Sequence, residues 1–306
     1  MNRKYPPFAF VLPFMVLFAL FFIGPLLYAL YVSLFVQHFG VNHFVGLQNY
    51  RVALTDPTFW QAVARVAYYG VVQVSIMLTL ALLLALLLDS PFATRYQIIF
   101  RLLFFLPYAV PGVIAAIMWG FLYAPSLDPL LHAIGPGINP LASGSVLYAI
   151  VNIALWEWTG YNMTIYFASL TSIPIEIYDA AKIDGCGEMQ LAWHIKIPLL
   201  RSTMVMTTVL SIIGSLQLFN EPYILSTLTS MPSNFTPNMD VYNFAFSYDN
   251  IPYAAALSMV LAALTIVASL AFLAVVRERT PRDVEGNLHT RRRRWYSLTK
   301  SREVVG

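Results

Sequence analysis

Six long apolar runs constrain the fold of this chain more than any other feature. They cover residues 8–35, 62–88, 98–123, 146–170, 202–225 and 252–276. An α-helix needs about 20 apolar residues to cross the hydrocarbon core of a bilayer, and each run is longer than that. Of the 306 residues, 58% are hydrophobic and 11% are charged, whereas soluble domains carry about 25% charged residues. The composition excludes a water-soluble enzyme and predicts an all-α, polytopic membrane protein with six transmembrane helices.

The basic residues indicate how these spans are oriented. Of the 18 Lys and Arg residues, 16 fall on one side, and only Arg51 and Arg65 fall on the other. Loops rich in Lys and Arg stay on the cytoplasmic side of a membrane. We therefore expect a multi-pass protein of a bacterial or archaeal cytoplasmic membrane with both termini inside. Residues 1–306 would form one transmembrane domain that ends in a basic cytoplasmic tail over 277–306.

The fourth connecting segment, residues 171–198, carries the signals of two short helices joined by a tight turn. Pro174 can begin a helix because no partner is needed there for its missing N–H. Glu176 would lie in the first turn, where the helix dipole favours a negative charge. Gly185 can end this helix in a left-handed conformation, and a second helix would run from about 188 to 195. These signals alone fit an ordinary connector as well as a functional element.

The residue pattern of this segment points to a specific family. It contains Asp179–Ala181, Asp184–Cys186 and Ile195–Pro198 at the spacing of the EAA loop of ABC-importer permeases, which reads Glu-Ala-Ala, Asp-Gly-Ala and Ile-x-Leu-Pro. The segments Trp156–Met163 and Tyr253–Ser258 resemble the carbohydrate-uptake branch of these permeases, the maltose-transporter type. The resemblance is specific in the loop and diffuse in the spans.

The resemblance implies a role in energy coupling for the segment. In the family, this loop fits a cleft on a cytoplasmic ATPase, and ATP-driven closure of two ATPase subunits moves the loops and the spans. The docking residues implied are Asp179, Ala180, Ala181, Asp184 and Gly185. Asp179 replaces the family's glutamate and would pair with a basic ATPase residue, which puts the strength of coupling in question.

The chain itself carries no sign of catalysis. It contains no Gly-x-x-x-x-Gly-Lys-Ser/Thr motif, so we expect ATP and Mg²⁺ to be bound by the partner ATPase and no cofactor to be bound here. One cysteine and five scattered histidines show no metal-ligand spacing. The expected partners are a second, related but distinct permease subunit, two copies of an ABC ATPase, an extracellular solute-binding protein and a sugar. No nucleic acid is expected.

Polar side chains inside two of the apolar runs predict the solute pathway. Polar groups are costly within a membrane and are functional candidates by default. The candidates in the fourth and fifth runs are Glu157, Trp158, Tyr161, Asn162, Gln217, Asn220 and Glu221. Carboxylates and amides bind hydroxyl groups, and aromatic rings stack on sugar faces, so this set favours a neutral carbohydrate. A sugar phosphate or glycerol phosphate is less favoured because it would require a cationic partner.

Other interpretations of these residues stay open at this point. Glu157 could form a structural pair, and Gln217 and Asn220 could be hydrogen-bonding links between helices. Gln73 and Trp119 are expected to pack. A chain that works alone as an ion-coupled secondary carrier would use Glu157 as a proton site, although such carriers usually show an inverted repeat, and none is seen here. A structural subunit without a pathway is the third alternative.

Overall fold

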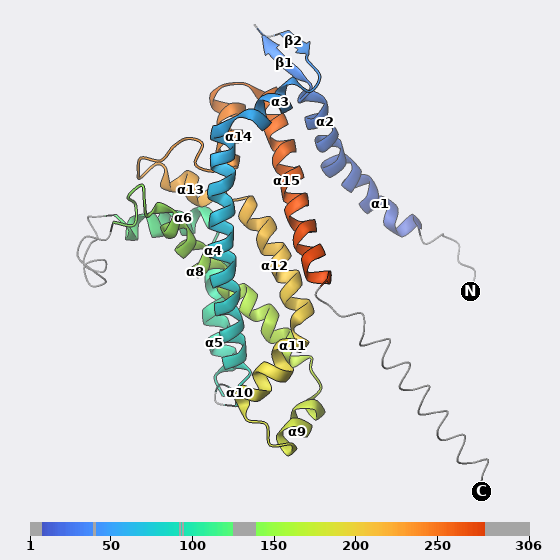
Figure 1. Cartoon of the computed structure of the whole chain (residues 1–306), viewed down its shortest axis with the longest axis vertical. Coiled ribbons are helices and arrows are strands. Elements are labelled where there is room, and N and C mark those ends of the chain that lie inside the picture. The colour runs from blue at the N-terminus through green and yellow to red at the C-terminus, as the bar shows by residue number, and fades with distance from the viewer. Residues whose placement is uncertain (1–7, 39–40, 92, 94, 125–138, 279–306) are drawn as a thin grey trace, which may run out of the picture.

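The computed structural model describes residues 8–38, 41–91, 93, 95–124 and 139–278. Its longest helices are α4 (Pro57–Leu88), α8 (Val146–Thr171), α12 (Arg201–Leu216) and α15 (Ile251–Glu278). In this bundle α4 packs on α8 and α12, and α12 packs on α15 (Figure 1). The predicted basic tail lies outside the described residues from position 279 onward.

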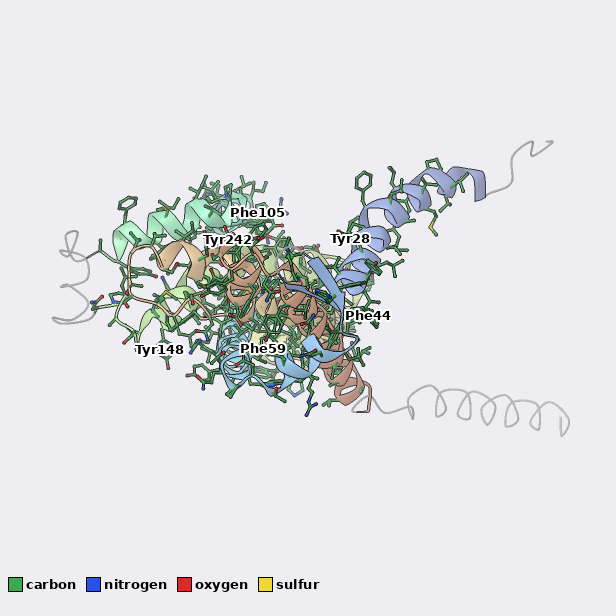
Figure 2. All side chains as sticks on the ribbon, turned by 90° about the horizontal axis from the view of Figure 1, so that it is seen from above. Tyr28, Phe44, Phe59, Phe105, Tyr148 and Tyr242 are labelled. Carbon is green, nitrogen blue, oxygen red and sulfur yellow. The ribbon has the colours of Figure 1, made fainter. Side chains whose placement is uncertain are left out.

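The first apolar run forms one helical rod that stands apart from the bundle. It comprises α1 (Phe8–Phe18), the π-helix η1 (Ala19–Ile23) and α2 (Gly24–Val32). Of these three helices, α2 packs on α15. Figures 1 and 2 show the rod leaning away from the other helices, and Figure 2 shows Tyr28 on its free surface. Within residues 11–32, no residue of the most apolar 18-residue stretch is buried inside the protein. The apolar surface of the rod is therefore available to lipid or to another subunit.

A short hairpin follows the rod and shortens the first predicted span. Strands β1 (Phe35–His38) and β2 (Val41–Phe44) pair antiparallel, and α3 (Gln48–Thr55) follows them. The Asn49 side-chain amide donates to the carbonyls of Ser33 at 2.8 Å and Phe35 at 2.6 Å. These carbonyls are thereby satisfied outside a helix, so the helix ends at residue 32 and not at residue 35. The fold is all-α except for this hairpin.

The second predicted span begins earlier than expected. The Asp56 side chain accepts a hydrogen bond from the Thr58 backbone N–H at 2.8 Å, and Pro57 occupies the first helical position. An aspartate at the N-cap followed by proline is a strong helix start. Helix α4 therefore begins at Pro57, and the apolar run predicted from residue 62 covers only its later part.

The third predicted span is broken, which contradicts the expectation of one helix over 98–123. It consists of α5 (Gln97–Phe105), the 3₁₀-helix η2 (Leu106–Ala109) and α6 (Gly112–Leu122), and the two halves meet at 95°. Pro111 lacks an N–H, and its ring would clash with the carbonyl four residues earlier in a continuous helix. The chain therefore turns at η2, and α6 leaves at a steep angle.

The fifth predicted span is also interrupted. Helix α12 ends at Leu216, and α13 (Asn220–Leu225) begins after three residues that are not helical. Pro222 lies in the first turns of α13, and in a continuous helix its ring would clash with the Leu218 carbonyl. Residues 214, 217 and 221 therefore do not share one face of a continuous helix. Two short helices, α14 (Pro237–Tyr242) and the π-helix η5 (Asn243–Ser247), then lead to α15.

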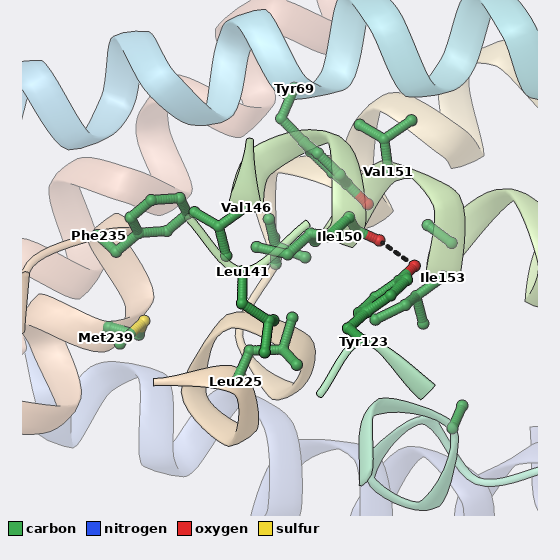
Figure 3. Close-up of a cluster of buried hydrophobic side chains, with 14 residues drawn as sticks. Tyr69, Tyr123, Leu141, Val146, Ile150, Val151, Ile153, Leu225, Phe235 and Met239 are labelled. Carbon is green, nitrogen blue, oxygen red and sulfur yellow. Dashed lines mark hydrogen bonds between the residues drawn. The ribbon is translucent and has the colours of Figure 1, made fainter. Parts of the chain in front are cut away.

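The fourth predicted span is confirmed as a helix and lies at the centre of the fold. Figure 3 shows Ile150 of α8 packed with Tyr69 of α4 and Leu225 of α13 in one buried cluster. The Tyr123 hydroxyl donates to the Ala149 carbonyl at 3.2 Å, which ties the end of α6 to α8 (Figure 3). The part of the molecule that contains this cluster is therefore organised around α8.

Four of the described helices are long and apolar enough to cross a membrane, and the bent pair would be a fifth. The four are Val11–Val32, Pro57–Leu88, Arg201–Leu225 and Ile251–Val276. Helix α8 has 26 residues and is not among these four. Figure 2, seen along the bundle, shows Phe59 of α4 among the packed helices.

Asp240 on α14 predicts a pH dependence of stability. Its carboxylate is 7% exposed, and burial together with the nearby Asp56 raises the pKa of Asp240 from 3.8 to about 6. Because the folded state holds this proton more tightly than the unfolded chain, the contribution to stability is complete below pH 4 and is lost as the pH rises through 6. Asp240→Asn is expected to raise the melting temperature at pH 7.5 and to leave it nearly unchanged at pH 4.5, measured in detergent by tryptophan fluorescence. A wild-type melting temperature at pH 7.5 would contradict this.

Candidate functional site

A cavity of about 460 Å³ lies between the central helices of the bundle. Helix α4 contributes Tyr69, Gln73 and Met77 to its wall, and α12 contributes Ser211 and Ser215. Helix α8, the interruption at 217–219 and the start of α13 complete the lining. A cavity of this size matches the range of small-molecule sites.

Three of the predicted pathway residues on α8 line this cavity. They are Trp158, Tyr161 and Asn162. The ring of Tyr108, from η2, stacks on Tyr161 with centroids 4.5 Å apart and meets the Trp158 ring edge-on at 5.2 Å. The Asn162 amide donates to the Trp158 carbonyl at 3.0 Å. The cavity therefore has an aromatic wall whose rings are held from behind by Tyr108, a residue that the sequence did not single out.

The break in the third span brings together three more of the predicted pathway residues, Glu157, Asn220 and Glu221. Gln217, Asn220 and Glu221 line the cavity. Glu157 does not line it, but a β-carbon on Gly112 would lie 3.5 Å from a Glu157 carboxylate oxygen and 3.6 Å from one of Glu221. Two carboxylates from different helices thus converge on the start of α6. The other Glu157 oxygen is buried without a hydrogen-bond partner among the described residues.

Gln73 forms a hydrogen bond between helices in addition to the packing expected of it. Its side-chain oxygen accepts a hydrogen bond from the Ser215 hydroxyl at 3.1 Å, and its amide nitrogen faces the Met77 sulfur at 3.1 Å. Gln73 is 5% exposed and still forms part of the cavity wall. It joins α4 to α12 beside the pathway. Its position in a largely apolar run was the available signal.

No positively charged side chain is found among the described residues that line the cavity. Among the lining residues that the structure describes, Glu221 is the one acidic residue and none is a lysine or arginine. The remaining polar groups are amides, hydroxyls and phenols. Such groups donate to and accept from hydroxyl groups, and the aromatic rings offer stacking faces. The arrangement suits an uncharged, polyhydroxylated molecule.

The segment between α8 and α12 lies at the end of the molecule opposite the hairpin (Figure 1). It comprises α9 (Ile175–Ile183), α10 (Glu188–Leu191), the π-helix η4 (Ala192–Lys196) and α11 (Ile197–Leu199), and we call 171–198 the coupling segment. Gly185 has a φ of +83°, and the N–H groups of Gly185 and Cys186 donate to the carbonyls of Lys182 and Ala181. These bonds form a Schellman motif, which ends α9 as the sequence predicts.

The predicted docking residues are largely accessible on this segment. Asp179, Ala180, Asp184 and Gly185 are exposed, whereas Ala181 is buried at 7% exposure and packs inward. Large apolar side chains accompany them: Ile183 is 86% exposed, Met189 71% and Trp193 64%. Exposed apolar groups in one small region mark protein contact sites.

The comparison with known families identifies the chain. The family of binding-protein-dependent transport system inner membrane components matches residues 77–280. The chain belongs to this family. The permease is 35% identical to the lactose transport system permease protein LacF of Rhizobium radiobacter over 88% of this chain and 93% of that protein. It is 30% identical to the arabinooligosaccharides transport system permease protein AraP of Bacillus subtilis over 88% of each chain.

Solved structures show that the permease shares its fold with ABC importers. A bacterial ABC transporter involved in the import of the acidic polysaccharide alginate matches 90% of this chain and 96% of that chain, with a TM-score of 0.77 and 19% identity. The same kind of transporter in complex with an alginate pentasaccharide-bound periplasmic protein matches with a TM-score of 0.75 and 18% identity. At these identities the likeness concerns the fold. The family match and the apolar helices show that the permease is a multi-pass protein of the inner membrane.

Proposed function

We propose that the permease is one of two membrane subunits of an ATP-driven, binding-protein-dependent importer of a neutral sugar. The observation that carries this proposal is the aromatic and amide-lined cavity, with Trp158 and Tyr161 on one side and Gln217 and Asn220 on the other. The similarity to permeases for lactose and arabinooligosaccharides supports the same solute class. The chain would form half of the pathway, and a related, distinct permease would form the other half.

A six-span topology with both termini in the cytoplasm fits the helices. The four apolar helices and the bent pair account for five spans. Helix α8, with 26 residues, would be about 39 Å long at 1.5 Å per residue, which exceeds the hydrocarbon core of about 30 Å. Its Glu157 and Asn162 side chains face protein and not lipid, because they are about 5% exposed. We infer one membrane domain on this basis.

The coupling segment would dock on a cytoplasmic ABC ATPase. Its exposed tip combines the carboxylates of Asp179 and Asp184 with the apolar side chains of Ile183 and Met189. A mixed surface of this kind fits a cleft that has an apolar floor and a basic rim. Two ATPase copies would bind ATP and Mg²⁺ and would supply the chemical energy, and an extracellular binding protein would deliver the sugar. The permease chain itself would bind no cofactor and catalyse no reaction.

Reconstitution tests this function directly. The permease is tagged, purified from its native membrane with the subunits that accompany it, and placed in proteoliposomes. We expect uptake of a labelled neutral oligosaccharide that requires ATP inside the vesicles and the binding protein outside, while glycerol phosphate is not taken up. Uptake by the chain alone, driven by a proton or sodium gradient, would contradict the proposal and favour a secondary carrier.

Replacement of Trp158 by alanine is expected to weaken sugar transport without loss of assembly. Loss of one stacking ring costs about 1 kcal/mol, which corresponds to a roughly fivefold to tenfold higher half-saturating sugar concentration. Trp60 offers a matched control, because both tryptophans are 38% exposed and Trp60 lies outside the cavity. We expect Trp60→Ala to leave the half-saturating concentration unchanged. Equal effects of the two substitutions would show that Trp158 only packs.

A further inference from the structure

A buried lysine lies where the coupling segment meets the bundle. Lys196 is 4% exposed, although lysine is almost never fully buried unless it is paired. Its ammonium lies 2.7 Å from an Asp89 carboxylate oxygen and 3.9 Å from one of Glu188. It also lies 5.4 Å from the centre of the Tyr178 ring. These partners come from three separate elements.

Asp89 gives this lysine a connection beyond its own segment. It follows the last residue of α4, and its backbone N–H donates to the Ala85 carbonyl at 3.0 Å. A negative charge at this end of a helix is disfavoured by the helix dipole, so the carboxylate there needs a cation. Lys196 supplies that cation, and the ion pair joins α4 to the coupling segment. The adjacent Leu88 carbonyl accepts a hydrogen bond from the Gln97 side chain at 2.8 Å, so α5 meets α4 at the same corner.

The other partners of Lys196 lie within the coupling segment. Tyr178 belongs to α9, and burial together with the nearby Asp89 raises the pKa of its hydroxyl to about 12. Glu188 begins α10. Lys196 itself ends the π-helix η4, and single π-helical turns within α-helices occur frequently at functional sites. One ammonium group therefore holds α9 and α10 against the end of α4.

The position of this ion pair determines which spans can respond to movement of the segment. The chain links the segment covalently to α8 and α12 only. Helix α4 packs on both, contributes Gln73 and Tyr69 to the cavity wall, and lacks a covalent link to the segment. A displacement of α9 can be transmitted directly to α4 through Lys196 and Asp89. Tightly packed elements transmit such displacements as rigid bodies.

We propose that Lys196 and Asp89 form the joint through which movement of the docked coupling segment reaches α4 and the cavity wall. The proposal rests on the proposed importer function. Both residues are positioning residues: neither touches the solute, and each acts by keeping the segment and α4 together. The joint makes α4 move with the ATPase and not only with its neighbouring helices.

The first test removes both charges together. Deletion of one partner alone would leave a buried, unpaired charge and could prevent folding. In Lys196→Met/Asp89→Asn no buried charge is left unpaired, because the side chain of Glu188 is 43% exposed. We expect this variant to retain the ATPase on purification and to hydrolyse ATP, while sugar uptake per ATP falls about fivefold to tenfold, as for a coupling energy near 1 kcal/mol. Lys196→Arg, which keeps the charge, should retain at least half of the wild-type ratio. A wild-type ratio in the double variant would overturn the proposal.

A second test remains informative if the neutral pair does not fold. Cysteines replace Asp89 and Lys196 in a Cys186→Ala background, which removes the native cysteine. A bifunctional thiol reagent about as long as the lysine side chain then reconnects the two positions. We expect the reagent to restore uptake per ATP at least threefold, and a monofunctional thiol reagent to have no such effect. Loss of uptake on cross-linking would show that the two elements must separate during transport.

The same measurements distinguish failure of the joint from failure of the importer function. If the permease is not part of an ATP-driven importer, the wild-type chain shows no ATP-dependent uptake and no co-purifying ATPase. If only the joint is wrong, wild type and the double variant show the same sugar uptake per ATP, and both retain the ATPase.

Discussion

Replacement of Gly160 by alanine is expected to destabilise the permease severely. A β-carbon at this position would overlap the backbone carbonyl of Phe104 and would lie 3.0 Å from the Phe105 nitrogen. Small residues allow membrane helices to approach this closely, and here the opposing atoms are backbone atoms that no rotamer change can move. We expect a loss of about 3 kcal/mol or more, at or above the upper end of overpacking penalties. Thermal melting in detergent and the yield of monodisperse protein measure it.

Gly214 provides the matched control for this substitution. It also lies in a long helix, and a β-carbon there would meet nothing within 4 Å. Gly214→Ala should therefore be neutral or should stabilise the protein by about 0.5–1 kcal/mol, the helix-propensity difference. Since the chemical change is identical at the two positions, the difference reports the close approach of α8 to α5. Similar melting temperatures for the two variants would mean that these helices are further apart.

Reversal of charge at Asp179 is expected to detach the ATPase. Asp179 is exposed on α9, so Asp179→Lys should change the stability of the permease by less than about 0.5 kcal/mol. Close charge pairs across interfaces couple by about 1.5–7 kcal/mol, so the expected loss of ATPase affinity is at least tenfold. The measurement is the amount of ATPase that co-purifies with a tagged permease, together with sugar-stimulated ATP hydrolysis.

Two further substitutions separate charge from backbone geometry at this site. Asp179→Glu keeps the carboxylate and should retain the ATPase at the wild-type level. Gly185→Val should weaken binding through the turn, because the φ of +83° is unfavourable for a β-branched residue by about 1–2 kcal/mol. Normal assembly and normal stimulation in both Asp179→Lys and Gly185→Val would contradict the docking role.

Several predictions from the sequence concern features that local chemistry controls. The apolar runs identify most helices because burial in lipid requires apolar side chains over a known length. Gly185 ends α9, and Asp56 caps α4, because these effects involve only neighbouring residues. The breaks within the third and fifth spans were not predicted. Pro111 and Pro222 were visible in the sequence, but whether a proline kinks a helix or breaks it depends on what replaces the lost hydrogen bonds.

The amino-acid sequence by itself determined that this chain lies in a membrane, where most of its helices run and which segment carries the docking pattern. These properties depend on composition and on short-range spacing. Only the tertiary structure decided that Glu157 and Glu221 converge on Gly112, that Gln73 joins α4 to α12, and that Lys196 pairs with Asp89. Each of these contacts joins residues from different helices. Their geometry follows from helix packing angles and from the two breaks, which no local pattern encodes.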